Sequence, residues 1–141
     1  MEQEDYCSYE LALKLKACGF CEPCDHYYTN GYANHDSEDT SRVVRLHYDR
    51  TYNYNCVISA DGECFSAPLL YHAQKWLREK KGIAINVIVH DGGAYDYDIV
   101  FLPNAVDCDY PIDRATFSRT YEEALSEGIA SALELIEQEK K

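Results

Sequence analysis

Apolar side chains recur at helical spacing in three segments of the chain, residues 9–18, 69–81 and 121–138. Because residues three and four apart share one face of a helix, each segment is predicted to form an amphipathic helix packed on a core. The positions predicted to form the apolar faces are Leu11, Leu15, Cys18, Leu69, Leu70, Ala73, Trp76, Leu77, Tyr121, Ala124, Leu125, Gly128, Ile129, Ala132, Leu133 and Ile136.

Residues with capping chemistry stand at the start of each predicted helix. A hydroxyl oxygen accepts a hydrogen bond from a free N–H of the first turn, so Ser8 is predicted to cap the first helix. Ser66 is predicted to cap the second, with Pro68 in its first turn. Thr120 and Glu123 have the spacing of a capping box before the third helix.

Short apolar or alternating runs between the helices predict antiparallel strands. Residues 24–33, 43–48 and 55–59 are predicted strands, and Asn30–Gly31 is predicted to form a turn. The polar segment 34–41 is predicted to be a loop.

The clearest pair of strands is residues 83–90 and 95–102, joined around the sequence DGGA. A loop of even length would pair Val89 with Asp96 and divide the apolar side chains between two faces. A three-residue loop pairs Val89 with Tyr95 and keeps those side chains together. We therefore predict the three-residue loop, with a glycine in the left-handed conformation beside a bulge.

The resulting order of elements is helix, strands, helix, β-hairpin, helix. This order predicts the α+β class, with an antiparallel β-sheet and three helices packed mainly on one of its faces. A chain of 141 residues is long enough to bury one sizeable core, so residues 1–141 are expected to form a single globular domain.

Composition and charge argue against several kinds of function. The formal net charge is −12, and direct binding to nucleic acid normally needs a basic surface. No apolar run approaches the roughly 20 residues that cross a bilayer, and the acidic N-terminus is unlike a signal peptide. We therefore expect a cytoplasmic protein, bound neither to a membrane nor directly to nucleic acid, whose seven cysteines are free thiols.

Three cysteines at three-residue spacing are the first candidate for chemistry. Cys18, Cys21 and Cys24 resemble part of an iron–sulfur or zinc motif, but Tyr28 stands where a ferredoxin motif has its fourth cysteine. The simpler interpretation places Cys18 on the apolar face of the first helix, Cys21 in a turn and Cys24 on the first strand. We favour that interpretation and assign no metal or cofactor.

A histidine and two aspartates on the predicted hairpin are the second candidate. His90, Asp96 and Asp98 are expected on one face of the sheet, where they could support acid–base or metal chemistry. The preferred interpretation is that this face is exposed to solvent, and no catalytic residue is assigned. A small metal-dependent or hydrolytic enzyme that uses these residues, or the three cysteines, remains the alternative function.

Tyrosine is abundant, with thirteen copies, six of them between Tyr27 and Tyr54. Tyrosine beside amides, as in RTYNYN, is common on protein-binding surfaces, so Tyr52 and Tyr54 are predicted to be exposed binding residues. On the last helix, Glu123, Glu127 and Glu134 are predicted to form an exposed acidic stripe. We therefore expect a non-enzymatic protein that binds another protein, and a homodimer is left open.

Four segments carry a resemblance that covers most of the chain: YELALKLKACGFCEPCDHYY, CFSAPLLYHAQKWLREKKGIAINVIV, YDYDIV and TYEEALSEGIASALELIE. They resemble a family of small uncharacterised proteins encoded by gut anaerobic bacteria, often near prophages or other mobile DNA. The resemblance implies a free-standing single domain and a phage or mobile-element context. It implies no cofactor and no catalytic residue.

Overall fold

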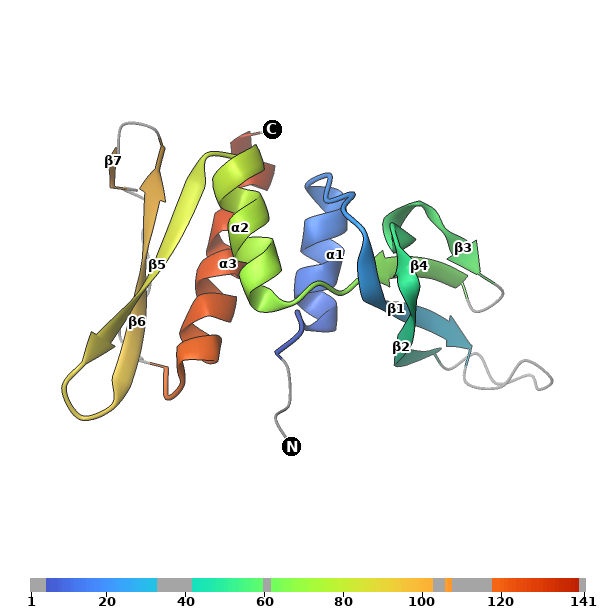
Figure 1. Ribbon diagram of the computed structural model, residues 1–141, viewed down its shortest axis with the longest axis horizontal. Helices are drawn as coiled ribbons and strands as arrows, with labels where there is room; N and C mark the ends of the chain where they lie inside the picture. The colour runs from blue at the N-terminus through green and yellow to red at the C-terminus, as the bar shows by residue number, and fades with distance from the viewer. Residues whose placement is uncertain (1–4, 33–41, 60–61, 103–105, 108–117, 140–141) are drawn as a thin grey trace. The chain divides into compact units, whose positions relative to one another are not determined.

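The computed structural model describes residues 5–32, 42–59, 62–102, 106–107 and 118–139 (Figure 1). The chain forms two compact units, which are described separately. The amino-terminal unit is Tyr6–Pro68, and the carboxy-terminal unit is Leu69–Lys141 together with Met1–Asp5. The predicted loop at residues 34–41 lies outside the described residues.

The amino-terminal unit combines a helix with an antiparallel sheet. Its elements are α1 (Tyr9–Ala17), β1 (Cys24–Tyr32), β2 (Arg42–Tyr52), the short 3-10 helix η1 (Tyr54–Cys56), β3 (Ile58–Ser59) and β4 (Gly62–Ser66). The strand order is β2-β1-β4-β3. As predicted, Ser8 caps α1, because its Oγ accepts the Leu11 N–H at 3.3 Å. Gly19 follows the helix with φ 91°, and Phe20 folds back to donate its N–H to Leu15 O.

Helix α1 lies against one face of this sheet. The ring of Tyr9 packs edge-on against the rings of Tyr28 and Phe65, each at 5.7 Å between centroids. Asn30 Nδ2 donates to Tyr9 Oη at 3.1 Å. Because side chains alternate along a strand, Tyr27 lies on the opposite face of the sheet from Tyr28.

The predicted turn at Asn30–Gly31 is wrong. β1 continues through both residues, and Gly31 pairs with Val43 on β2. A turn-forming dipeptide can still occupy a strand when the partner strand extends past it, and here the ladder continues to the pair Tyr32–Arg42.

The predicted cap at Ser66 is also wrong. Ser66 is the last residue of β4, it is fully buried, and its Oγ accepts the N–H of Tyr54 at 3.1 Å. The second helix begins four residues later, with Leu69 at the N-cap and no side-chain cap. The hydroxyl that suits a helix cap is used instead to satisfy a buried backbone donor.

The carboxy-terminal unit packs two helices on a β-hairpin. Its elements are α2 (Leu70–Lys80), β5 (Ile83–His90), β6 (Ala94–Phe101), β7 (Val106–Asp107) and α3 (Tyr121–Glu139), with strand order β5-β6-β7. Both helices lie on the same side of the hairpin (Figure 1). Gln74 of α2 donates to Ile85 O, and Tyr97 of β6 shares a hydrogen bond with Ser131 of α3.

The core of this unit follows the predicted helix faces. The side chains that it buries on α2 and α3 are Leu70, Ala73, Trp76, Leu77, Ala124, Leu125, Ile129, Ala132, Leu133 and Ile136. Two predicted positions differ: Leu69 is the N-cap of α2 and is only partly buried, and Tyr121 stands at the first position of α3 and is 44% exposed. Thr120 accepts the N–H of Glu123 as a capping residue, whereas the Glu123 carboxylate accepts the N–H of Arg119.

The predicted hairpin register is confirmed. Val89 pairs with Tyr95, Val87 with Tyr97 and Ile85 with Ile99. Gly92 and Gly93 both have positive φ in the three-residue loop, a backbone conformation that glycine adopts without strain.

The α+β class and the order of the elements are confirmed. The described strands nevertheless form two antiparallel sheets, one in each unit, where one sheet was expected. Strands pair most readily with neighbours along the chain, and helix α2 separates the two groups of strands. Among the described residues, no helix is long and apolar enough to span a bilayer.

Candidate functional site

Four aromatic rings meet on the face of the amino-terminal sheet opposite α1. The Tyr27 ring stacks with His47 at 4.8 Å between centroids and with Tyr54 at 4.1 Å. Tyr52 meets Tyr54 edge-on at 5.8 Å. We call these four residues, Tyr27, His47, Tyr52 and Tyr54, the aromatic cluster.

Backbone pairing places these rings together. On β1, Tyr27 pairs with His47 of β2 on one side and with Ser66 of β4 on the other. Ser66 Oγ accepts the Tyr54 N–H, which fixes the segment after β2 above the sheet. His47 Nε2 is 2.8 Å from Thr29 Oγ1, so a hydrogen bond holds the imidazole in place.

A cavity of about 300 Å³ opens beside the aromatic cluster. It is lined by Tyr27, Asp49, Arg50, Tyr52, Tyr54, Val57 and Cys64. The Arg50 guanidinium carbon lies 5.7 Å from the centre of the Tyr52 ring, a cation–π distance. Asp49 Oδ1 accepts the Arg50 N–H at 2.7 Å, and this carboxylate contributes the negative charge of the lining. The cavity therefore offers aromatic faces and both signs of charge.

The two tyrosines that were predicted to be exposed binding residues differ in their exposure. Tyr52 is 43% exposed and lines the cavity, whereas Tyr54 is only 7% exposed, so its predicted exposure is wrong. Tyr54 is buried because its ring stacks on Tyr27 and its hydroxyl donates to Arg50 O. Burial, followed by the nearby Asp49 carboxylate, raises the pKa of Tyr54, which keeps that hydroxyl protonated and able to donate.

Sequence reasoning missed most of the cavity's other residues. Tyr27 is far from Tyr52 along the chain, and only the pairing of β1 with β2 brings it near. Its position on a predicted strand was the one available signal, since a strand residue places its side chain on a definite face.

The three predicted glutamates belong to the carboxy-terminal unit and not to the cavity. Glu123 and Glu127 are exposed, and Glu134 is partly buried. Two of the carboxylates have local partners: Glu123 accepts the Arg119 N–H, and Glu127 accepts the Ser118 hydroxyl, both at 3.2 Å. These two residues therefore stabilise the start of α3.

The three cysteines take the places that the simpler interpretation gave them. Cys18 is buried at the end of α1, Cys21 is exposed in the following turn, and Cys24 is buried at the start of β1. Burial, reinforced by the charges of Asp25 and Glu22, raises the pKa of the Cys24 thiol to about 12. The thiol therefore stays protonated at neutral pH and is a poor nucleophile or metal ligand.

We predict that alkylation at neutral pH separates the six cysteines among the described residues into two classes. Cys21 and Cys56 are exposed and should react with iodoacetamide in the folded protein. The buried thiols should react only after unfolding in urea; they are Cys7, Cys18, Cys24 and Cys64. Peptide mapping by mass spectrometry measures each site. Rapid labelling of Cys24 in the folded protein would contradict its burial and its raised pKa.

Replacing Cys21 with serine should leave the free energy of unfolding within about 0.5 kcal/mol of the wild type, because an exposed turn side chain contributes little burial. Urea denaturation followed by circular dichroism measures the difference. A matched change at the buried Cys18 should be clearly destabilising, since it places a hydroxyl in the apolar core. A large loss of stability at Cys21 would mean that this thiol has a structural or metal-binding role.

The histidine and aspartates of the hairpin are only partly on a solvent-facing surface. Asp96 is 8% exposed, so its predicted exposure is wrong. Its Oδ1 accepts the Tyr97 N–H at 2.7 Å, a bond that offsets the cost of burying a carboxylate. His90 Nε2 lies 3.9 Å from Asp96 Oδ2, and Asp98 is partly buried on the same strand. Among the described residues, no group of three or more His, Cys, Asp or Glu side chains is placed to hold a metal ion.

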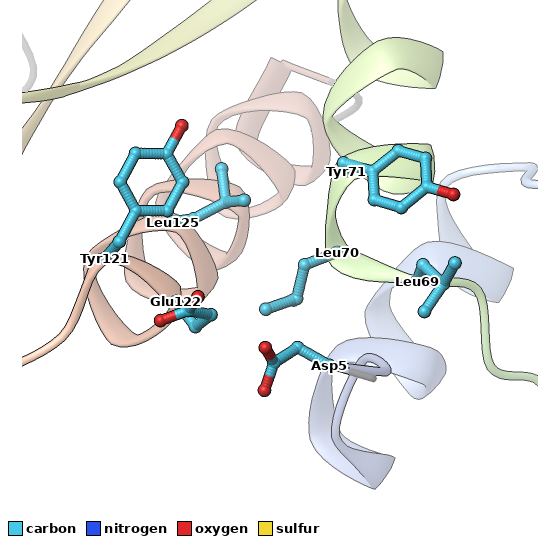
Figure 2. A pocket seen from close by; sticks show the side chains of 7 residues that line it. All are labelled: Asp5, Leu69, Leu70, Tyr71, Tyr121, Glu122 and Leu125. Atoms are coloured by element: carbon cyan, nitrogen blue, oxygen red, sulfur yellow. The ribbon is translucent and has the colours of Figure 1, made fainter. Parts of the chain in front are cut away.

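A second cavity, of about 250 Å³, lies in the carboxy-terminal unit at the beginnings of α2 and α3 (Figure 2). Three leucines and two tyrosines form most of its lining, which is Asp5, Leu69, Leu70, Tyr71, Tyr121, Glu122 and Leu125. Glu122 stands in the first turn of α3, where the helix dipole favours a carboxylate. This cavity is mainly apolar, and its ionisable side chains are the carboxylates of Asp5 and Glu122 and the hydroxyls of two tyrosines.

Comparison of the chain with protein-family models, with curated proteins and with solved structures found no match.

Proposed function

We propose that this protein is a non-enzymatic binding protein that recognises a basic partner protein through the aromatic cluster and its cavity. The observation that carries this proposal is the meeting of three tyrosine rings, an arginine and a carboxylate around one cavity. Tyrosine and arginine are enriched at the centres of protein interfaces, where rigid rings supply contact area at low entropic cost.

The charge of the chain supports a basic partner. With a net charge of −12, the protein attracts positive surfaces over distances comparable to the Debye length and repels acidic ones. In the cavity, the Asp49 carboxylate and the tyrosine faces can both bind a lysine or arginine side chain. Long-range charge and local contacts therefore favour the same class of partner.

Two features favour binding over the enzymatic alternative. The buried Cys24 thiol has a pKa of about 12 and is not activated for attack. The second candidate, His90 with Asp96, belongs to the carboxy-terminal unit, whereas the aromatic cavity belongs to the amino-terminal unit. The resemblance to proteins of phages and mobile elements adds the proposal that the partner is a host or phage protein.

Capture from a bacterial lysate on the immobilised protein, followed by mass spectrometry, identifies the partner. The purified partner is then measured by surface plasmon resonance at a series of salt concentrations. The Debye length falls from about 10 Å at 0.1 M to about 3 Å at 1 M, so the association rate should fall strongly across this range. An acidic partner, or an association rate that does not change with salt concentration, would refute the electrostatic part of the proposal.

Replacing Tyr52 with alanine should raise the dissociation rate of that complex by about 10-fold or more, because truncating an interface aromatic commonly has a large effect. Tyr52 is suited to this test because it is partly exposed, unlike Tyr54. Tyr71, which is 64% exposed and lies in the other unit, is the matched control, and Tyr71→Ala should leave the dissociation rate unchanged. Equal effects of the two changes would show that the aromatic cavity is not the binding site.

A further inference from the structure

Strand β2 is an edge strand of the sheet that the described residues form, and it carries many apolar side chains. It lies at one end of the strand order, paired with β1 along one side, and no described strand pairs with its other side. Half of the ten exposed large hydrophobic side chains among the described residues belong to this strand: Val43, Val44, Leu46, Tyr48 and Tyr52. Its backbone donors and acceptors on the outer edge are a template for another strand.

We propose that two copies of the chain associate by antiparallel pairing of β2 with β2 of the second copy, with His47 of each copy on the two-fold axis. The sequence of β2, RVVRLHYDRTY, is centred on His47. In an antiparallel pair related by a two-fold axis, residues equally far from the centre on either side lie opposite each other. The pairing is therefore favourable only if the side chains of β2 are complementary to those of the same strand in reverse order.

The pairs nearest the axis are complementary. Arg45 lies opposite Asp49 of the second copy, and the symmetry repeats this ion pair on the other side of the axis. Leu46 lies opposite Tyr48 of the second copy, and this aliphatic–aromatic pair is also repeated. Cross-strand pairs of both kinds stabilise sheets.

Neighbouring registers fit less well. An axis at Leu46 would place Arg42 opposite Arg50 of the second copy, so like charges would face each other twice. An axis at Tyr48 would remove the arginine–aspartate pairs. Arginines on an edge strand usually oppose pairing, and only the register centred on His47 gives one of them a carboxylate directly opposite. Charge complementarity thus favours a second copy of the chain as the partner of this edge, and it selects the register centred on His47.

The ladder with β1 limits the extent of this pairing. The β1–β2 register shifts between Cys24 and His26, and beyond the shift the Arg50 carbonyl accepts the Tyr54 hydroxyl. The symmetric pairing is therefore centred on Arg45–Asp49, which makes a small interface and a weak dimer that depends on concentration. This inference does not depend on the aromatic cavity binding a basic partner.

The first test measures mass against concentration by sedimentation equilibrium. The wild type should approach twice the mass of one chain as concentration rises. Arg45→Asp and Asp49→Arg should each raise the dimer dissociation constant by about 10-fold or more, because each places like charges opposite each other twice. The double variant Arg45→Asp/Asp49→Arg should restore dimerisation, since the pairs are only exchanged. A wild type that stays monomeric, or a double variant as weak as the singles, would overturn the proposal.

The second test uses disulfide cross-linking and does not depend on the strength of the charge pairs. In a Cys21→Ser/Cys56→Ser/Cys108→Ser background, which leaves only the buried native cysteines, His47→Cys should form a disulfide between copies. Directly opposite residues have Cα atoms about 4.5–5.5 Å apart, which suits a disulfide. Asp49→Cys is the matched control, since in this register two copies of position 49 are about 14 Å apart, four residues along a strand. Circular dichroism checks that both variants fold. Equal cross-linking at the two positions, or none at position 47, would refute the register.

Discussion

Replacing Trp76 with alanine should lower the free energy of unfolding by about 3–5 kcal/mol, the range found when a large aromatic side chain is removed from a core. Trp76 is 4% exposed and is one of the four buried residues of α2, and Gln74 anchors the same helix to β5 through Ile85 O. The Lys81 ammonium lies 5.5 Å from the centre of the Trp76 ring, which adds a cation–π contact at the end of the helix. Replacing Trp76 removes the packing of its ring and the cation–π contact with Lys81, and it leaves a cavity.

Urea denaturation followed by far-UV circular dichroism measures this loss. Tryptophan fluorescence cannot follow the variant, because Trp76 is the only tryptophan in the chain. Tyr71→Ala on the exposed side of the same helix is the control and should change stability by less than about 0.5 kcal/mol. A loss below about 1 kcal/mol for Trp76→Ala would show that this residue is not part of the core.

Replacing Gly128 with valine should lower the free energy of unfolding by about 2–3 kcal/mol, because the site has no room for a side chain. A Cβ atom at this position would lie 2.6 Å from Ile85 Cγ2 and 3.2 Å from Tyr97 Cδ2. Glycine is normally unfavourable inside a helix by about 1 kcal/mol relative to alanine. Its presence in the middle of α3 therefore reflects the close approach of the helix to the hairpin.

A double-mutant cycle separates this clash from a loss of helix propensity. Gly128→Ala should be destabilising in the wild type, because the gain in helix propensity is smaller than the cost of moving Ile85. In an Ile85→Ala background the same change should be neutral or stabilising, since the Cγ2 atom is absent. The coupling between the two sites should be about 0.5–3 kcal/mol. If Gly128→Ala stabilises both backgrounds equally, α3 does not approach the hairpin this closely.

The aromatic cavity shows how much of a candidate site could be predicted from the chain. Tyr52 was predicted to be exposed because tyrosine beside amides is typical of binding surfaces, and it is 43% exposed. The exposure of Tyr54 was predicted wrongly, since its burial depends on Tyr27 and on the hydroxyl of Ser66. No local pattern reports which ring will stack on which. The glutamates were predicted to form an exposed stripe, but Glu134 is partly buried, and bonds to Arg119 and Ser118 give the other two local roles.

The alternation of apolar and polar residues by itself determined the helices, the hairpin register and the α+β class. These depend on periodicities of about 3.6 and 2 residues and on glycine in a left-handed turn, all of which are local properties. Val89 opposite Tyr95 and the capped start of α1 at Ser8 are examples.

Some residues could locally adopt either of two conformations, and for these the tertiary structure alone decided which one forms. Ser66 could cap a helix or end a strand, and the unsatisfied N–H of Tyr54 selected the strand. Asn30–Gly31 could turn or extend, and the length of β2 selected the extended form. In each case the deciding partner is a backbone group or strand whose position depends on the folded chain, so its effect is absent from the local pattern of residues.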